Sequence, residues 1–170
     1  MTICIIHHIF KSMKRDGKII CEKKSRELEE VCRRNGLALT IQRRAILESL
    51  ASRFDHPTAD QVYEDISCRI KGISRTTVYR VLETFVEIGL AKKISNPESK
   101  ARFDADTARH HHLTCTNCGA VLDLFDDSLN NLPLPTGIEK DFDIRDYSIT
   151  FTGLCSACVA EREKMSIDEG

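Results

Sequence analysis

The sequence predicts an α+β protein in which a helical first part ends in a short β-hairpin and a smaller second part contains strands. Three observations support this expectation. Capped amphipathic segments fill residues 25–89, two strand patterns flank a turn at residues 95–99, and two Cys-x-x-Cys pairs follow in the second half. Two such pairs supply four thiolates, so we expect a metal ion to hold the second part together.

Composition favours two modules with different partners. The chain has 170 residues, of which 41% are hydrophobic, so it can bury a core. Its net charge of −1 hides a division. Residues 1–103 carry 20 Lys+Arg against 13 Asp+Glu, whereas residues 104–170 carry 5 against 13. A basic first part weakly favours nucleic acid as its partner.

The sequence shows no secretory signal and no apolar run of membrane-spanning length. We therefore expect a cytoplasmic protein without a membrane partner, in a reducing compartment where paired cysteines usually bind metal.

Four helices are expected before Gly89, each with a start or stop signal. The first begins at Ser25 and ends at Asn35-Gly36. The caps of the other three are Thr40, Thr58 with Gln61 as its capping-box partner, and Ser74. Helical spacing marks the apolar side chains that should be buried: Leu28, Val31, Cys32, Ile46, Leu47, Leu50, Val62, Tyr63, Ile66, Val78, Val81, Leu82, Phe85 and Val86.

The last two helices, joined by a short turn at Lys71-Gly72-Ile73, fit a helix-turn-helix, although an ordinary helical bundle fits the pattern about as well. In a helix-turn-helix, five residues would lie near the exposed start of the recognition helix and could contact bases or phosphates: Arg75, Thr76, Thr77, Tyr79 and Arg80. The strand patterns at 90–94 and 100–103 then predict the wing of a winged helix, with Lys92 and Lys93 meeting phosphate.

The second part carries the cysteines. Cys115 and Cys118 form one pair, Cys155 and Cys158 the other, and 36 residues separate the pairs. A single pair could be a redox site, but two favour a closed, structural Zn²⁺ site. We expect a strand at 120–125, a loop at 130–136, one bulged strand or two over 142–151, and a polar tail at 163–170.

Together these residues resemble the ferric uptake regulator family of metal-dependent transcription repressors, from about Leu28 to Cys158. The matching segments are Thr40-Ile41-Gln42-Arg43-Arg44, His56-Pro57-Thr58-Ala59-Asp60, Thr77-Val78-Tyr79-Arg80-Val81-Leu82, Gly89-Leu90, Arg102-Phe103, His110-His111-His112-Leu113-Thr114-Cys115-Thr116-Asn117-Cys118-Gly119 and Gly153-Leu154-Cys155. Ile41 departs from the proline usual there, at a helical first turn that tolerates either residue.

The resemblance implies a division into four segments: an extension at 1–24 that we expect to be disordered, a winged-helix domain with the start of a hinge at 25–103, a metal-binding α/β dimerisation domain at 104–162, and the tail at 163–170. It implies structural zinc at the four cysteines. It also implies a regulatory metal held by matched residues of both domains: His56, Asp104, His110, His112 and Asp123. Imidazoles and carboxylates suit Fe²⁺ or Mn²⁺, with Zn²⁺ as a substitute.

The resemblance further implies a homodimeric repressor of a double-stranded DNA operator, with no small-molecule substrate other than metal and H₂O₂. Asp123 looks like the peroxide-responsive members. Arg80 looks like the iron-uptake regulators, which remain the alternative, ahead of a zinc-uptake regulator. A further metal site of some members looks degraded here, because its matching places hold His111, Asn130 and Tyr147.

Several single residues and the whole chain also have alternative interpretations. His56 could simply be a helix-entry residue before Pro57, and His111 is expected to face solvent. Cys32 and Cys68 are expected to be buried thiols. A metallohydrolase or a zinc-stabilised interaction module is a weaker reading, because the sequence has no nucleophile motif and the helix-turn-helix would be redundant. We expect that the protein is not an enzyme.

Overall fold

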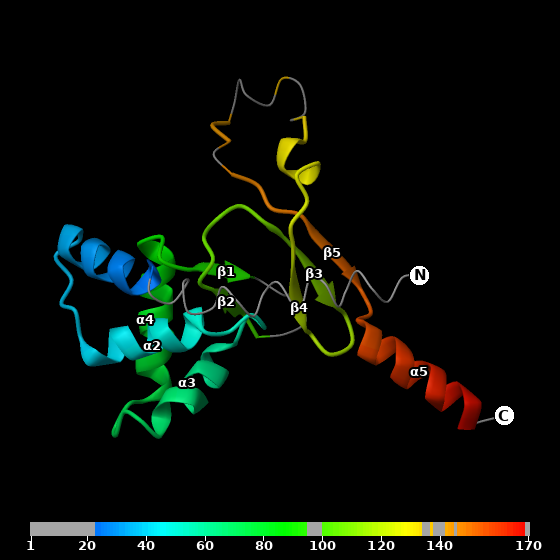
Figure 1. Cartoon of the computed structure of the whole chain (residues 1–170), viewed down its shortest axis with the longest axis horizontal. Helices are drawn as coiled ribbons and strands as arrows, with labels where there is room; N and C mark the ends of the chain where they lie inside the picture. Colours follow the sequence, from blue (N-terminus) through cyan, green and yellow to red (C-terminus); the bar gives the residue numbers. More distant parts are fainter. Residues whose placement is uncertain (1–22, 95–99, 134–136, 138–141, 145, 169–170) are drawn as a thin grey trace. The chain divides into compact units, whose positions relative to one another are not determined.

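The computed structural model describes residues 23–94, 100–133, 137, 142–144 and 146–168. The chain divides into two compact units, with the boundary between Thr107 and Ala108 (Figure 1). The sequence-based division begins the second domain at Asp104, whereas the structure includes this residue in the first unit. Within the described ranges, no helix is both long and apolar enough to span a membrane.

The first unit contains the four expected helices. They cover residues 23–34, α2 (Ile41–Ala51), α3 (Ala59–Ser67) and α4 (Arg75–Glu87). Each predicted N-cap is confirmed: the side-chain oxygens of Thr40, Thr58 and Ser74 accept hydrogen bonds from the backbone N–H three residues on. The capping box of Thr58 and Gln61 is complete. Local side-chain chemistry therefore determines where these helices begin.

The first helix begins earlier than the sequence indicated, because Lys23 and Lys24 already belong to it. Lys24 is 5% exposed, and its ammonium donates to the Leu90 carbonyl (3.4 Å) and to Thr107 Oγ1 (3.3 Å). These bonds, and an ion pair with Glu27 at 3.0 Å, compensate for the burial of its charge. The rest of the expected disordered extension, residues 1–22, lies outside the described residues.

The core of the first unit is the apolar face that the helical spacing predicted. Side chains from all four helices and from the hairpin meet there, and the largest of them are Leu28, Ile46, Leu47, Leu50, Ile66, Leu82, Phe85, Leu90 and Phe103. Val31, Tyr63, Val81 and Val86 pack at its edge and stay partly exposed. Gly89 has a φ of 75°, a left-handed conformation that ends α4 at little cost for glycine.

The expected hairpin follows α4. Strands β1 (Lys92–Ile94) and β2 (Arg102–Asp104) pair antiparallel, with Lys93 opposite Phe103. Residues 95–99, where the turn was expected, lie outside the described residues. Thr58 forms an isolated bridge with Arg102, which ties the start of α3 to β2. A helix-turn-helix followed by this hairpin has the architecture of a winged helix.

The second unit is a three-stranded sheet of order β4-β3-β5, followed by a helix (Figure 1). Its elements are β3 (His111–Cys115), β4 (Val121–Leu124), the 3₁₀ turn η1 (Leu129–Asn131), β5 (Thr150–Gly153) and α5 (Ser156–Asp168). The central strand β3 pairs antiparallel with β4 and parallel with β5. The expected strand at 120–125 is confirmed, and η1 occupies the start of the region expected to be a loop.

One expectation for the second unit is wrong. Residues 142–144 and 146–149 form no strand, so the pattern over 142–151 yields only β5. Its pairing with β3 starts at Thr150, and the preceding Ile149 N–H donates to His111 Nδ1 instead of a strand. The polar segment after residue 162 continues α5 as far as Asp168. Its polarity does not prevent a helix, because an exposed helix needs no apolar face to satisfy its own backbone hydrogen bonds.

We expect Phe85→Ala to lower the free energy of unfolding by about 3–5 kcal/mol, because it opens a cavity at a fully buried position. Ile41→Ala is the matched control, since Ile41 is 79% exposed and its loss should change stability by less than about 0.5 kcal/mol. Urea denaturation of the zinc-loaded protein, followed by circular dichroism, measures both. Equal losses would contradict this assignment of the core.

Candidate metal centres and nucleic-acid interface

The four cysteines of the two pairs meet in one cluster in the second unit. Their sulfurs, one from each residue, all lie within 4.8 Å of one another. Cys115 ends β3 and Cys118 follows in a turn closed by the Gly119 N–H, which donates to the Cys115 carbonyl at 3.0 Å. Gly119 has a φ of 68°, which the tight turn requires. The second pair lies at the junction of β5 and α5.

The geometry of this cluster fits tetrahedral Zn²⁺. Zn–S bonds of about 2.3 Å give a tetrahedron whose sulfur–sulfur edges are about 3.8 Å. Cys118 Sγ and Cys155 Sγ are 3.8 Å apart. The Cys155 N–H donates to Cys115 Sγ and the Asn117 amide donates to Cys158 Sγ, both at 3.3 Å. Donors of this kind orient thiolate ligands, so the residues fit a structural zinc ion.

The pKa values of two of these thiols, Cys115 and Cys158, are shifted in opposite directions. The backbone N–H groups of Cys118 and then Cys155 lower the pKa of Cys115 to about 6. The Asn117 amide also lowers the pKa of Cys158, but hydrogen bonds with the other three cysteines, together with burial, outweigh it and raise that pKa to about 12. Opposite shifts within one cluster indicate crowded thiols that a divalent ion would neutralise together.

A second group in this unit contains nitrogen and oxygen ligands. His110 Nε2 lies 3.1 Å from His112 Nε2 and 3.3 Å from Asp123 Oδ1, and His112 Nε2 lies 3.8 Å from the same carboxylate oxygen. The register of β3 and β4 brings His112 directly opposite Asp123. Both imidazoles are almost completely buried. Three ligand atoms therefore converge at one place.

The tautomer of His110 suits metal binding. Its Nδ1 lies 3.0 Å from the carbonyl of Ala108, which can only accept a hydrogen bond. A neutral ring that donates from Nδ1 carries its lone pair on Nε2, the atom that faces His112 and Asp123. A backbone carbonyl commonly orients a metal-binding imidazole in this way.

A complementary pair lies in the first unit. His56 Nε2 and Asp104 Oδ2 are 3.9 Å apart, and the two residues are 3% and 8% exposed. Asp104 Oδ1 accepts the Asp106 N–H at 2.8 Å, which fixes the carboxylate. The interpretation of His56 as a simple helix-entry residue is too limited, since its ring is buried and faces this carboxylate.

The residues expected to contact DNA lie at the start of α4 and on β1. Arg75, Thr76, Tyr79 and Arg80 are exposed, whereas the Thr77 hydroxyl lies 2.9 Å from the capping Ser74. Arg80 has no side-chain hydrogen bond or ion pair within the described ranges, but other cations here are paired. Arg75 meets Asp60 at 2.7 Å and stacks on the Tyr63 ring at 4.4 Å. Lys93 meets Glu83 at 2.7 Å, and Lys92 is half-buried.

Two single-residue expectations are wrong. His111 is fully buried rather than solvent-facing, because its Nδ1 accepts the Ile149 N–H and its ring stacks on Tyr147. Alternation with His110 and His112 predicted that His111 faces solvent, but residues preceding β5 cover this face of the sheet. Cys68 is exposed rather than buried, since it is the C-cap of α3 and extends beyond the helical face. Cys32 is buried as expected.

No pattern other than the family resemblance indicated Asn117 or Arg102 before the structure was described. Asn117 lies inside the first cysteine pair, where only the fold shows that its amide reaches Cys158 of the other pair. Arg102 immediately precedes Phe103 in a matched motif. Its hydrogen bond to the His56 carbonyl forms only because the fold brings these two residues together. The resemblance motif was the only signal that could have indicated either residue.

A winged helix joined to a sheet with clustered metal ligands defines a class, the metal-responsive DNA-binding regulators. The ferric uptake regulator family model matches residues 34–152, and the chain belongs to this family. A zinc uptake regulator that is similar in fold, with a TM-score of 0.60 at 20% identity, was solved in complex with zinc and DNA.

Similar proteins come from sequence and from structure. A peroxide-responsive repressor PerR from Staphylococcus epidermidis is 35% identical over 138 residues, covering 79% of this chain and 92% of the relative. The ferric uptake regulator from Pseudomonas aeruginosa with manganese has a TM-score of 0.62 at 27% identity, over 75% and 97% of the two chains. The Helicobacter pylori regulator, with a TM-score of 0.69 at 20% identity over 82% and 93%, is similar in fold.

We expect Cys118→Ser to release zinc and to dissociate the dimer, because zinc binding supplies folding free energy to this unit. Metal analysis after gel filtration measures both effects. Cys68→Ser is the matched control, since this exposed cysteine is remote in sequence from both pairs and should keep one zinc ion per chain. A Cys118→Ser protein that remained dimeric and folded without zinc would contradict a structural role for the cluster.

Proposed function

We propose that the chain is a peroxide-sensing repressor that binds its operator as a homodimer when its regulatory metal is bound. The main support is the convergence of His110, His112 and the carboxylate of Asp123 in one buried group. Such ligands suit Fe²⁺ and Mn²⁺. The similarity to a protein named as a peroxide-responsive repressor supports the same reading. We further propose that the protein is cytoplasmic and is not an enzyme.

The regulatory ion would be shared between the two units. We propose that His56 and Asp104 of the first unit complete its ligands with those of the second unit, His110, His112 and Asp123. All five ligands together should bind a divalent ion more tightly than either partial set by itself. Binding would then favour the arrangement in which both sets meet, which is a population shift towards the DNA-binding form.

We infer the peroxide response from the similarity to a peroxide-responsive repressor. Bound Fe²⁺ supplies the redox chemistry that activates H₂O₂, which Mn²⁺ does not readily supply. The net step transfers one oxygen atom from H₂O₂ to a ring carbon of His56 or His110 and leaves one water molecule. The oxidised imidazole is a poorer ligand, so the ion would be released together with DNA.

We propose that structural Zn²⁺ at Cys115, Cys118, Cys155 and Cys158 supports the dimer. One apolar face of the sheet is available for the second copy: Leu113 pairs with Leu122 on one side and with Phe151 on the other. These three side chains are 39–46% exposed. Burying such a face against its copy would supply hydrophobic stabilisation.

An iron-responsive regulator is the second candidate, which Arg80 favours by resemblance. Both candidates use the same metal ligands and the same DNA face. They differ in whether a histidine is oxidised, so one experiment separates them.

We expect H₂O₂ to add one oxygen atom to the peptide containing His56 or His110 in the Fe²⁺-loaded protein. The Mn²⁺-loaded protein is the control and should remain unmodified and DNA-bound. Mass spectrometry after brief exposure, with a parallel gel shift, measures both. If no histidine gains oxygen while DNA binding still follows iron, the iron-responsive candidate is correct.

For the DNA face, we expect Arg80→Ala to weaken operator binding by about 1–3 kcal/mol, because its exposed guanidinium could reach a base edge. Arg75→Ala should cost a similar amount if DNA displaces Asp60 from its guanidinium. Lys92→Ala should weaken operator and random DNA alike and flatten the salt dependence. Fluorescence anisotropy over a salt series measures this. Equal arginine losses on random DNA would make them phosphate contacts.

A further inference from the structure

The backbone at His56 is unusual. Its φ of 49° makes it the one non-glycine residue with positive φ in the described part of the chain. A left-handed conformation is energetically unfavourable for a residue with a side chain and persists only when its surroundings hold it. The contacts that hold His56 therefore help to determine where its imidazole lies.

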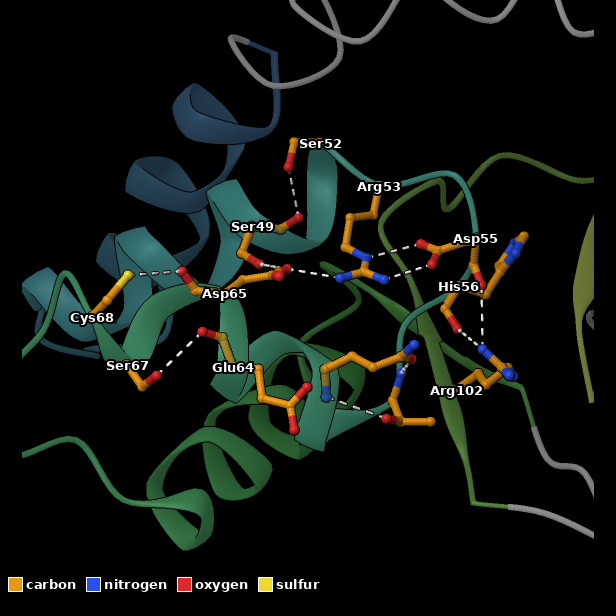
Figure 2. A network of polar contacts seen from close by, with 12 residues as sticks. Ser49, Ser52, Arg53, Asp55, His56, Glu64, Asp65, Ser67, Cys68 and Arg102 are labelled. Atoms are coloured by element: carbon orange, nitrogen blue, oxygen red, sulfur yellow. Dashed lines mark hydrogen bonds and ion pairs between the residues drawn. The ribbon is translucent and has the colours of Figure 1, made fainter.

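Arg102 of β2 supplies the most direct of these contacts. Its Nη1 donates to the His56 carbonyl at 2.9 Å and to the Asp55 carbonyl at 3.3 Å, as Figure 2 shows. The backbone adds a third link, because the Phe103 N–H donates to the Pro57 carbonyl at 3.0 Å. One short strand thus binds three successive carbonyls around the strained residue.

The same loop is held from the α2 side (Figure 2). Arg53 forms a bidentate pair with Asp55, with Nε–Oδ1 and Nη2–Oδ2 distances of 2.8 and 2.5 Å. Its third nitrogen meets Asp65 of α3 at 2.9 Å, and Ser49 of α2 donates to the same Asp65 oxygen at 3.0 Å. Arg53 fixes the side chain of Asp55, whereas Arg102 fixes the carbonyls of Asp55 and His56.

Arg102 occupies its position at an energetic cost, which indicates that its hydrogen bonds to the Asp55 and His56 carbonyls are stabilising. Its Nε is buried and has no hydrogen-bond partner among the described residues. Leaving a buried donor of a charged group unpaired is energetically unfavourable. A shorter or apolar residue would avoid this cost, but it would leave the carbonyls of Asp55 and His56 without the guanidinium.

β2 also carries Asp104, two residues beyond Arg102, and side chains two apart in a strand share a face. We propose that Arg102 is a positioning residue for the regulatory metal, which fixes the His56 imidazole opposite Asp104 before the ion binds. This inference rests on the proposed function, because it assumes that His56 and Asp104 are ligands. The winged-helix part of the metal site would then be preformed in the metal-free protein.

The experiment measures Mn²⁺ affinity of the full-length, zinc-loaded protein by electron paramagnetic resonance of free Mn²⁺. Arg102→Met removes the donors and keeps an apolar stem, and Arg102→Lys keeps the charge on a single ammonium. We expect Arg102→Met to weaken Mn²⁺ binding about 10–100-fold, as loss of contacts that orient ligands typically does, and Arg102→Lys to be intermediate. Arg69→Met, at an exposed arginine after α3, is the matched control and should bind normally.

A positioning role also makes a prediction that a purely structural role does not. In a His56→Ala background, Arg102→Met should cause no further loss of Mn²⁺ affinity, because it acts through His56. Zinc content, the thermal midpoint of the Mn²⁺-free protein and random-DNA affinity should stay close to wild type in Arg102→Lys. These readouts separate ligand placement from general stability.

Three outcomes would overturn the inference or its basis. Normal Mn²⁺ affinity in Arg102→Met, with weakened binding in His56→Ala, would remove the positioning role alone. Parallel losses of Mn²⁺ affinity and thermal midpoint in both Arg102 variants, additive with His56→Ala, would make Arg102 structural only. Normal affinity in His56→Ala would instead show that the proposed ligand assignment fails.

Discussion

The pairing of β3 with both of its neighbours is the constraint on which the second unit depends. One end of this strand carries His111 and His112, just after His110, and the other end carries Cys115. Antiparallel pairing sets His112 opposite Asp123, and parallel pairing brings Gly153, two residues before Cys155, beside Cys115. A slip of one residue would turn every side chain to the other face and separate both ligand groups at once. A cation at the cysteine cluster therefore secures the strand that presents the imidazoles.

The first unit holds the imidazole of His56 in a loop where the backbone φ is positive. The capped helices pack around Phe85 and Leu82. The polar ends of these helices lie outside this core, where they can contact other segments. Two of those ends, with Arg53 after α2 and Thr58 before α3, flank the loop at His56. The hairpin then binds that loop through Arg102 (Figure 2). The hairpin expected to contact phosphate as a wing thus also contacts the backbone of the proposed metal ligand, with Lys92 and Lys93 on β1 and Arg102 on β2.

Cation pairing within the first unit bears on how selectively this surface would bind DNA. Asp60 accepts from both Arg75 and Lys100, which hold its pKa below the ordinary value, Lys100 first and Arg75 second. Exposed pairs of this kind contribute little to stability. They do reduce the positive charge available to random DNA, whereas Arg80 keeps its guanidinium unpaired among the described residues. A base-specific contact can compensate for breaking one of these ion pairs, whereas binding to random DNA compensates less for the same loss.

The sequence by itself determined the local features, because each depends on neighbours within a few residues. The caps at Thr40, Thr58 and Ser74, the core face of α4 and the stop at Gly89 follow from hydrogen bonding and helical spacing. The spacing of the cysteine pairs likewise indicated zinc before any fold was known. The tertiary structure decided what depends on distant segments: the burial of His111 beneath Tyr147, the exposure of Cys68 and the single strand at β5. It alone revealed the positive φ of His56 and the contacts of Arg102, since strain becomes tolerable only when remote groups hold it.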